Sequence, residues 1–440
     1  MRVLLAAPLV VLLGVAPAPA QDRLTLEDAI ARAQSASPAA RAARAAAQEG
    51  AERLRGAQAG WWPRVDVSEA VHRGDQPVYV FGSLLSQRRF TAANFAIDAL
   101  NHPDALTNHR TAITAEQPLF SAEVLTGVRA ARVGRALAAA GREAVERDLA
   151  VDATRAFGEA LVAQSASRAA AAAVTSAEED LRRTRERRAA GVVTEADVLL
   201  VEVHLARMRA RRVEATARRQ VALAALNRVM GEPLDRDYVL QPATPDPSPH
   251  PPAAQLEAAA LLGRPEARQA ALQEQLARVH QAGARAALLP QVGLQGGYEW
   301  NGARFGDRSG AWNVSVQARW NLFAGLGDLS RIRAAGAARD RAEALRTSAE
   351  QGLRLEARTA RSQLEAALAR EGVGRTAVLH ALESQRIIRD RYESGLAGVH
   401  EVLRAANAVL DAEALRIAAV VDVMVGRAAV RKATGEAAGS

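Results

Sequence analysis

The stretch AWNVSVQARW, residues 311–320, breaks with the rest of the chain, most of which is alanine and arginine in helical patterns. Strict alternation gives this stretch one apolar face, made of Trp312, Val314, Val316, Ala318 and Trp320. The intervening residues are mostly polar. A period of two residues is the signature of a strand whose two faces meet different surroundings. We therefore predict a strand with a tryptophan at each end of its apolar face.

The preceding segment QVGLQGGYEW, residues 291–300, alternates in the same way, and a loop of residues 301–310 would join the two strands into a hairpin. In register, Tyr298 and Trp300 would lie near Trp312 at the loop end, and Trp320 would lie near Val292 at the other end. Strands of about 9 to 11 residues, apolar outside and polar inside, with aromatic residues at both rims, are typical of membrane β-barrels.

The first half of the chain carries a weaker counterpart of this hairpin. Trp61 and Trp62 precede an alternating segment at 65–71, the return strand runs over about 109–116, and a long loop, 74–108, lies between them. Glu69 falls on the nominally apolar face. Four strands cannot close a barrel, and open strand edges are not tolerated in lipid, so three copies would be needed for a 12-stranded barrel. The alternative is a soluble hairpin packed on the helices.

The remaining sequence predicts long helices. Aromatic residues make up only 4% of the 440 residues, and no proline occurs between Leu119 and Glu232 or after Pro290. Because proline costs a helix interior about 3 kcal/mol, these tracts permit very long helices. A helix over 121–188 would be on the order of 100 Å long at 1.5 Å per residue. The fold class is therefore mainly α with a small β part.

Each long tract has one break, which predicts a helical hairpin. In the first, Gly191 suits a helix C-cap, Thr194 an N-cap, and Asp197 the acidic position of a capping box. In the second, the break is SGLAG, 394–398. Both turns carry apolar residues, Val192 and Leu396 among them, which favours a contact surface. The alternative is that the turns only reverse the chain.

The chain also repeats itself. RERRAAGVVTEADVL at 185–199 matches RDRYESGLAGVHEVL at 389–403, and other matches recur at spacings of about 204 to 230 residues. This pattern indicates a duplication, with a first repeat at 21–240 and a second at 253–440, each with a helix, a β-hairpin and a long helical hairpin. Between them, residues 241–252 hold six prolines in twelve residues, which favours an extended linker.

Composition and the N-terminus narrow the function classes. Residues 1–20 read as a signal peptide, with a positive start, an apolar core and a small-residue cleavage site, so we expect an exported protein. The absence of cysteine excludes disulfides and thiolate sites. The net charge of +8 comes from arginines interleaved with acidic residues, as on solvated helices, and a nucleic-acid partner is not expected. No catalytic constellation, metal-ligand spacing or cofactor motif is found, so we predict neither an enzyme nor a cofactor.

Several segments in this order resemble the TolC-like outer-membrane efflux proteins, across essentially all of the mature sequence. They are LTLEDAI at 24–30, WWPRVDVS at 61–68, TAEQPLF at 114–120, GVVTEADVLLVEV at 191–203, LLPQVGLQGGY at 288–298, WNLFAG at 320–325 and YESGLAGVHEVL at 392–403. The resemblance implies a homotrimer in the outer membrane, with an α-helical barrel in the periplasm. It also implies the exit duct of a tripartite efflux or type I secretion system, with a periplasmic adaptor and an inner-membrane pump of RND or ABC type.

The resemblance assigns the turns to adaptor contact, and the candidate residues are Gly191, Val192, Thr194, Asp197, Leu199, Gly395, Leu396, Val399 and Leu403. It places a periplasmic gate at Glu401. Arg404 stands where the family has a second acid, which puts cation selectivity in doubt and suggests a Glu–Arg pair between subunits; ordinary surface charges are the alternative. The expected membrane-interface aromatic residues are Trp61, Trp62, Tyr298, Trp300, Trp312 and Trp320.

Two other function classes stay open at this point. One is a periplasmic adaptor or coiled-coil scaffold without a pore, which gives no reason for two aromatic-rimmed hairpins. The other is a cell-envelope enzyme, which the missing catalytic site disfavours. The transported substrate is not readable from the sequence, because a duct is generic and selectivity usually lies in the pump and adaptor.

Overall fold

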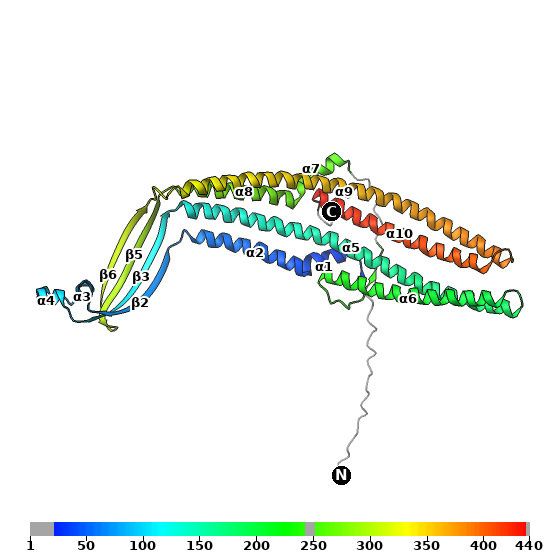
Figure 1. Ribbon diagram of the computed structural model, residues 1–440, viewed down its shortest axis with the longest axis horizontal. Coiled ribbons are helices and arrows are strands. Elements are labelled where there is room, and N and C mark those ends of the chain that lie inside the picture. Colours follow the sequence, from blue (N-terminus) through cyan, green and yellow to red (C-terminus); the bar gives the residue numbers. More distant parts are fainter. Residues whose placement is uncertain (1–21, 243–250, 437–440) are drawn as a thin grey trace, which may run out of the picture. The chain divides into compact units, whose positions relative to one another are not determined.

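The computed structural model describes residues 22–242 and 251–436, so the predicted signal peptide and most of the predicted linker lie outside the described residues. Figure 1 shows long helices and an antiparallel sheet. The elements follow in this order: β1 (Arg23–Leu24), α1 (Leu26–Ala36), α2 (Pro38–Ala59), β2 (Arg64–Gly74), α3 (Pro77–Ser86), η1 (Ala92–Phe95), α4 (Ile97–Asn101), β3 (Leu106–Phe120), α5 (Ala122–Ala189), α6 (Glu195–Met230), β4 (Val239–Leu240), α7 (Ala253–Gly263), α8 (Pro265–Ala286), β5 (Gln291–Arg304), β6 (Asp307–Arg319), α9 (Gly327–Glu393) and α10 (Val399–Thr434).

The elements of the second half follow those of the first in order and length. α1 and α7 each have 11 residues, α2 and α8 each have 22, α5 and α9 have 68 and 67, and α6 and α10 each have 36. The offset between matching elements is 227 residues from α1 to α7 (253 − 26) and 204 from α6 to α10 (399 − 195). The offset falls because the connection between β2 and β3 is much longer than that between β5 and β6.

The chain forms two compact units, and each takes residues from both halves of the sequence. Within the described residues, the first unit holds 22–42, 145–264 and 354–436, and the second holds 43–144 and 265–353. The predicted repeats at 21–240 and 253–440 are therefore not the boundaries of compact units, because the long helices α5 and α9 each contribute to both.

The first unit consists of helices around small apolar cores. One core joins residues of α1, α5, α6 and α10 to the short parallel pair β1 and β4, with Phe157, Leu226 and Tyr238 almost fully buried. The Tyr238 hydroxyl accepts a hydrogen bond of 2.8 Å from Arg32 Nη1, so the buried ring keeps a partner for its polar end. Within 22–242 and 251–436, no helix combines the length and the apolar character that a membrane crossing requires.

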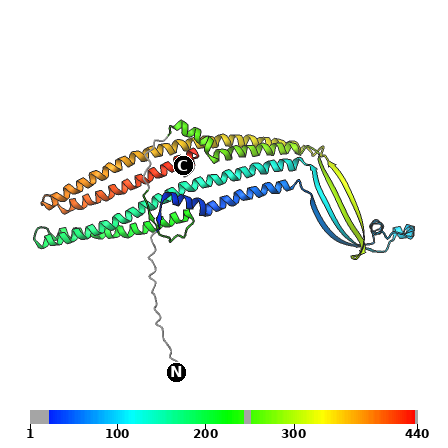
Figure 2. The same ribbon diagram turned by 180° about the vertical axis from the view of Figure 1, so that it is seen from behind.

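The two helical hairpins turn as the sequence predicts. Figure 2, which views the molecule from behind, shows α5 beside α6 and α9 beside α10. Gly191 and Gly395 have φ of 72° and 75°, a left-handed conformation that glycine adopts at little cost. Thr194 and Asp197 form the predicted capping box, with the Thr194 amide donating to Asp197 Oδ2 at 2.9 Å.

The second unit carries a four-stranded antiparallel sheet in the order β2-β3-β5-β6. The strands are longer than predicted. Residues 301–310 are not a loop, because Arg304 pairs with Asp307 and only residues 305 and 306 turn the chain. Residues 74–108 are not a simple loop either, since they hold α3, η1 and α4. Trp320 lies just beyond β6 rather than within it.

Register and alternation give the sheet two different faces. The apolar face carries Val65 and Val67 of β2, Ile113 of β3, Leu294 and Tyr298 of β5, and Trp312, Val314 and Val316 of β6. The polar face carries Asp66, Ser68, Thr114, Gln295, Asn301, Asn313 and Ser315. Sequence alternation alone predicted this division correctly for the second hairpin.

Candidate functional site

The apolar face of the sheet is open to its surroundings. Val67, Trp312 and Val316 keep 71%, 72% and 65% of their surface exposed, although they lie in the middle of regular strands. A contiguous exposed apolar face of this kind marks a surface that meets another apolar partner or lipid. The polar face opposite has the composition of a wall in contact with water.

Aromatic side chains lie at both ends of the apolar face, as predicted. At the helix-side end, Trp62 and Trp320 are exposed, and Trp320 Nε1 donates to the Leu288 carbonyl at 2.9 Å. Trp61 is half-buried at the same end. At the other end, Tyr298 pairs with Trp312 in register, and the Tyr298 and Trp300 rings are 4.5 Å apart. Amphipathic rings in two such groups suit the two interfaces of a membrane.

Glu69, the exception noted on the apolar face, has a partner that the sequence did not reveal. Its Oε1 lies 3.0 Å from Arg308 Nη2, and its other oxygen accepts from the Thr111 hydroxyl. The pair lies beyond the Tyr298–Trp312 row, toward the β5–β6 turn, and Phe305 stacks on the Arg308 guanidinium. Glu69 is therefore part of an ion pair at this end of the apolar face rather than an isolated charge.

The hairpin tips expose the apolar residues that the sequence singled out. Val192, Leu199 and Leu396 keep 62%, 53% and 70% of their surface exposed. Gly191 and Gly395 shape the turns, so their role within the chain is conformational. Thr194 and Asp197 are engaged with each other in the cap of α6, and the Thr194 contacts hold the pKa of Asp197 below its ordinary value.

Two of the predicted contact residues point inward instead. Val399 and Leu403 are 8% and 7% exposed, because the first turn of α10 packs its apolar side against the helices beside it. Val399 belongs to a core that also contains Val198 and Val201 of α6. These two residues hold the hairpin ends together and are not available on the surface of this chain. A helical period shows which residues share a face, but not which face is covered.

The predicted gate residues lie one helical turn apart at the start of α10. The Glu401 carboxylate accepts a hydrogen bond of 3.4 Å from the Gly398 amide, so it caps its own helix. Arg404 is exposed. A small cavity of about 80 Å³ lies close by, lined by Val402 and Leu403 of α10 and by charged residues of α5 and α9.

The sequence did not predict a cluster of charged residues from α5, α6 and α9 near the tips, which we name the charged junction. Arg187 of α5 stacks on the Tyr392 ring of α9 at 4.6 Å. Burial raises the pKa of Asp180 on α5, against the opposing effect of Arg389. Burial also lowers the pKa of His204 on α6, against the opposing effect of Asp180. A helical hairpin pattern gives no hint that charged residues far apart in the chain will meet here.

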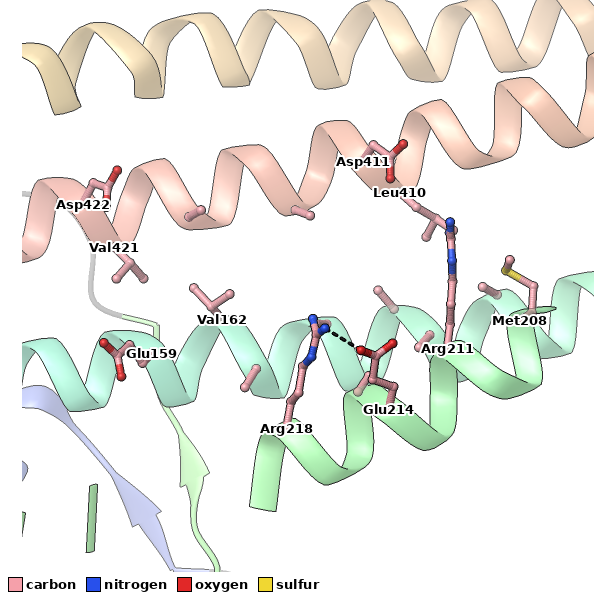
Figure 3. A pocket seen from close by; sticks show the side chains of 18 residues that line it. Glu159, Val162, Met208, Arg211, Glu214, Arg218, Leu410, Asp411, Val421 and Asp422 are labelled. Carbon is pink, nitrogen blue, oxygen red and sulfur yellow. Dashed lines mark hydrogen bonds and ion pairs between the residues drawn. The ribbon is translucent and has the colours of Figure 1, made fainter. Parts of the chain in front are cut away.

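A larger cavity, about 620 Å³, lies between α5, α6 and α10 in the first unit. Figure 3 shows Val162 and Val421 pointing toward one another across it, with the Arg218–Glu214 ion pair at its edge. Most of its other lining residues are alanines, whose short side chains leave the space open. The surface of the cavity is therefore mainly apolar.

No group of three or more metal-ligating side chains occurs among the described residues. The features that the structure assembles are instead an exposed apolar sheet face, a polar face behind it, and two exposed helical tips. The apolar face of the sheet has the exposed apolar character of a surface that meets lipid or an apolar partner, and the tips present exposed apolar side chains.

Comparisons with known proteins agree with this arrangement. The sequence is 28% identical to Protein CyaE of Bordetella pertussis over 437 residues, which cover 96% of this chain and 86% of that protein. The fold is similar to the CmeC outer membrane channel of Campylobacter jejuni, with a TM-score of 0.79, 16% identity and coverage of 93% and 85% of the two chains. It is also similar to the MtrE outer membrane channel of Neisseria gonorrhoeae, with a TM-score of 0.72, 18% identity and coverage of 93% and 89%.

These structural likenesses confirm the predicted fold class, a mainly helical chain with a small β part. The profile of the family described as "Outer membrane efflux protein" matches residues 29–232 and 256–436. That match covers most of the chain and confirms both the family resemblance and the outer-membrane localisation expected from the sequence. The chain belongs to the outer membrane efflux protein family.

Proposed function

We propose that three copies of this chain form the outer-membrane exit duct of a tripartite efflux system. The observation that carries the proposal is the exposed apolar face of an open sheet, with aromatic side chains at both ends. Such a face suits lipid, while the polar face suits a water-filled lumen. A duct of this kind conducts passively.

The geometry of the sheet favours closure by several copies. Its edge strands, β2 and β6, run in opposite directions, because each neighbouring pair in the order β2-β3-β5-β6 is antiparallel. The β6 edge of one copy can therefore pair with the β2 edge of the next in the same antiparallel manner. Unpaired edges are very costly in lipid, and three copies give an even number of strands within the range of known barrels.

The long helices support a periplasmic part that reaches toward the inner membrane. α5 has 68 residues, which corresponds to about 100 Å at 1.5 Å per residue. The exposed tips around Val192 and Leu396 are the proposed contacts for a periplasmic adaptor, and an inner-membrane pump of RND or ABC type would supply the energy. Glu401 and Arg404 are the proposed gate, through a pair between neighbouring subunits.

A second candidate is the exit duct of a type I protein secretion system, since the same duct geometry serves both. The two differ in the partner that meets the tips. A periplasmic scaffold without a pore is less well supported, because it leaves the exposed apolar face of the sheet without a function.

The experiment that tests the proposal is cross-linking in cells from single thiols at the tips. The chain has no cysteine, so Val192→Cys and Leu396→Cys each introduce one unique attachment point. Val399→Cys and Leu403→Cys are matched controls, because they lie within a few residues of the second tip but are buried. The cross-linked products are purified in detergent and identified.

We expect an adaptor to be captured from the two exposed positions and not from the buried controls. An adaptor recovered with a proton-driven pump supports efflux of small molecules or metal ions. An adaptor recovered with an ATP-driven protein exporter moves the assignment to secretion. Failure to capture a partner at either tip, together with absence of the chain from the outer membrane, would refute the duct and favour a scaffold.

A further inference from the structure

The connection between β2 and β3, residues 75–105, is named the outer strap here, and its first part, α3, crosses the sheet. α3 begins at Pro77, soon after β2 ends, and packs on β3, β5 and β6. At its far end, the Gln87 carbonyl accepts from Ser309 Oγ at 3.1 Å, and Arg88 Nη2 donates to the Gly310 carbonyl at 3.2 Å. The outer strap therefore runs from one edge strand of the sheet to the other.

Buried amide side chains fix the outer strap to the sheet. Gln87 Nε2 donates to Asn108 Oδ1 and to the Thr107 carbonyl, both at 3.0 Å. Asn108 Nδ2 in turn donates to Asn301 Oδ1 at 2.8 Å. Gln87, Asn108 and Asn301 are only 4%, 6% and 3% exposed. A series of buried amide side chains that hydrogen-bond to one another favours one position for the segment that carries them.

The face on which these anchors lie decides what the outer strap can do. Register places Asn108, Asn301 and Ser309 on the polar face, opposite to Trp312 and Val314. The outer strap thus covers the polar side of the sheet near the ends of its strands. The apolar face remains uncovered by it.

Apolar contacts keep the outer strap compact. Val80 is 6% exposed where α3 meets the sheet. The rings of Phe81 and Phe90 are 4.8 Å apart, and those of Phe90 and Phe95 are 5.1 Å apart, both edge to face. These contacts hold α3 against the following residues of the outer strap, so the segment forms a compact layer on the polar face.

The connection from β2 to β3 does not require a segment of this size. The other hairpin, β5–β6, ends in a turn of two residues, Phe305 and Gly306. Gly74 and Leu106, which flank the outer strap, are themselves paired in register and could be joined in the same way. The 31 residues of the outer strap (105 − 74) are thus extra material at one end of the sheet.

We infer that the outer strap is the size-limiting element at the external mouth of the duct. This inference rests on the proposed function, in which the polar face lines the lumen of a barrel closed by three copies. Each copy then places one outer strap across its own third of the wall, inside the mouth. The Gln87–Asn108–Asn301 chain holds the strap inward and thereby sets the largest solute that can pass.

The test is thiol labelling from outside intact cells, which reads the external mouth independently of any gate at the periplasmic end. Ser315→Cys is placed on the polar face, next to Gln295 in register and away from the outer strap. Ala99→Cys is placed on exposed α4, on the outer strap itself. Each is probed with a small maleimide and with a bulky polymer-linked maleimide that does not cross the outer membrane elsewhere.

The comparison is between the natural chain and a variant in which residues 75–105 are replaced by Asn-Gly, a dipeptide suited to a two-residue hairpin turn. We expect the bulky reagent to label Ser315→Cys several-fold faster once the outer strap is removed. Equal rates with and without the strap would overturn the inference. A second variant, Gln87→Ala with Ser309→Ala, keeps the whole segment but removes two of its anchors to the sheet. We expect it to label faster than the natural chain but more slowly than the chain without the outer strap. It provides the test on its own if the replacement fails to fold.

A wrong duct and a wrong size-limiting role would give different labelling results. If Ala99→Cys is not labelled from outside by either reagent, and Ser315→Cys resists even the small one in every variant, the duct itself is wrong and the inference falls with it. If both thiols react with the small reagent but the strap variants do not differ with the bulky one, the duct stands and only the size-limiting role is wrong.

Discussion

Arg308 Nη2 on β6 lies 3.0 Å from Glu69 Oε1 on β2, although these two strands form opposite edges of the sheet. The same guanidinium donates to the Thr111 hydroxyl on β3. The Arg308 side chain is 10% exposed and the Glu69 side chain 38% exposed. One arginine therefore links three of the four strands at the end of the apolar face.

Removing the charge of Glu69 should destabilise the sheet. Glu69→Gln keeps the shape of the side chain but leaves the Arg308 cation largely buried without its counter-charge, and hydrogen bonds to charged groups contribute about 1.5–3 kcal/mol. We expect a lower unfolding temperature in detergent. All five tryptophans, residues 61, 62, 300, 312 and 320, lie in the second unit, so tryptophan fluorescence reports on the sheet.

The control for this prediction removes both charges. Glu69→Gln combined with Arg308→Met leaves no unpaired buried cation, so part of the lost stability should return. An unfolding temperature for Glu69→Gln equal to that of the natural chain would show that the ion pair contributes nothing measurable.

A positive charge on the apolar face should block membrane insertion, whereas the same charge on the polar face should be tolerated. Val314→Arg and Ser315→Arg are a matched pair, because they are consecutive residues of β6 on opposite faces. An arginine on the lipid side near the membrane midplane costs about 2–4 kcal/mol. We expect Val314→Arg to be depleted from the outer-membrane fraction while Ser315→Arg is recovered there. Equal recovery of the two variants would contradict the assignment of the faces.

The alternation of Trp312, Val314 and Val316 was sufficient to predict a strand and its two faces, because side-chain period is a local property. The ends of the strands were not predictable in the same way. Gly302 and Ala303 carry no alternation of their own, yet they lie within β5, at an irregularity between the pairs Asn301–Ser309 and Arg304–Asp307. The sequence therefore located the strands but suggested a ten-residue loop where the structure has a two-residue turn.

Contacts between distant residues account for most of what the sequence missed. Glu69 was recognised as an exception on the apolar face, but its partner Arg308 is 239 residues away in the chain. Val399 and Leu403 fit an exposed tip by position, but another helix covers them in the folded chain. The turns themselves were predicted well, since Gly191 and Thr194 act through neighbours within a few residues.

Adding a methyl group at Gly158 should destabilise the first unit, because α5 and α10 come very close at this point. A β-carbon at Gly158 would lie 2.4 Å from Cγ1 of Val421, a stiff and buried side chain. Such overpacking typically costs about 1–3 kcal/mol. Thermal unfolding followed by far-ultraviolet circular dichroism should show a lower midpoint for Gly158→Ala.

The matched control is Gly372→Ala in α9, where a β-carbon would meet nothing within 4 Å. Replacing a helical glycine by alanine without a clash stabilises by roughly 0.5–1 kcal/mol, so the two variants should shift the midpoint in opposite directions. Val421→Ala should rescue Gly158→Ala by restoring the space. A stabilising effect of Gly158→Ala alone would mean that the helices are not in close contact there.

Acidification should weaken the helical tips through His204. Burial, together with Arg211 and Arg207, holds the pKa of His204 below its ordinary value of 6.5, and only Asp180 opposes this. The unfolded chain therefore binds the proton more readily than the folded chain between the lowered pKa and 6.5. The contribution of His204 to stability is present above pH 6.5 and is lost as the pH falls toward the lowered pKa.

His204→Gln removes this titration, so its free energy of unfolding in urea should fall less than that of the natural chain when the pH drops below 6.5. Asp180→Asn is the informative second variant, because burial raises the pKa of Asp180. The contribution of Asp180 to stability therefore has the opposite pH dependence to that of His204. It is lost as the pH rises from 3.8 through the raised pKa. If the free energy of unfolding changes with pH in the same way for the natural chain and for His204→Gln, His204 is not the group that makes the first unit sensitive to acid. A steeper loss in Asp180→Asn on acidification would confirm that the two groups oppose each other at this junction.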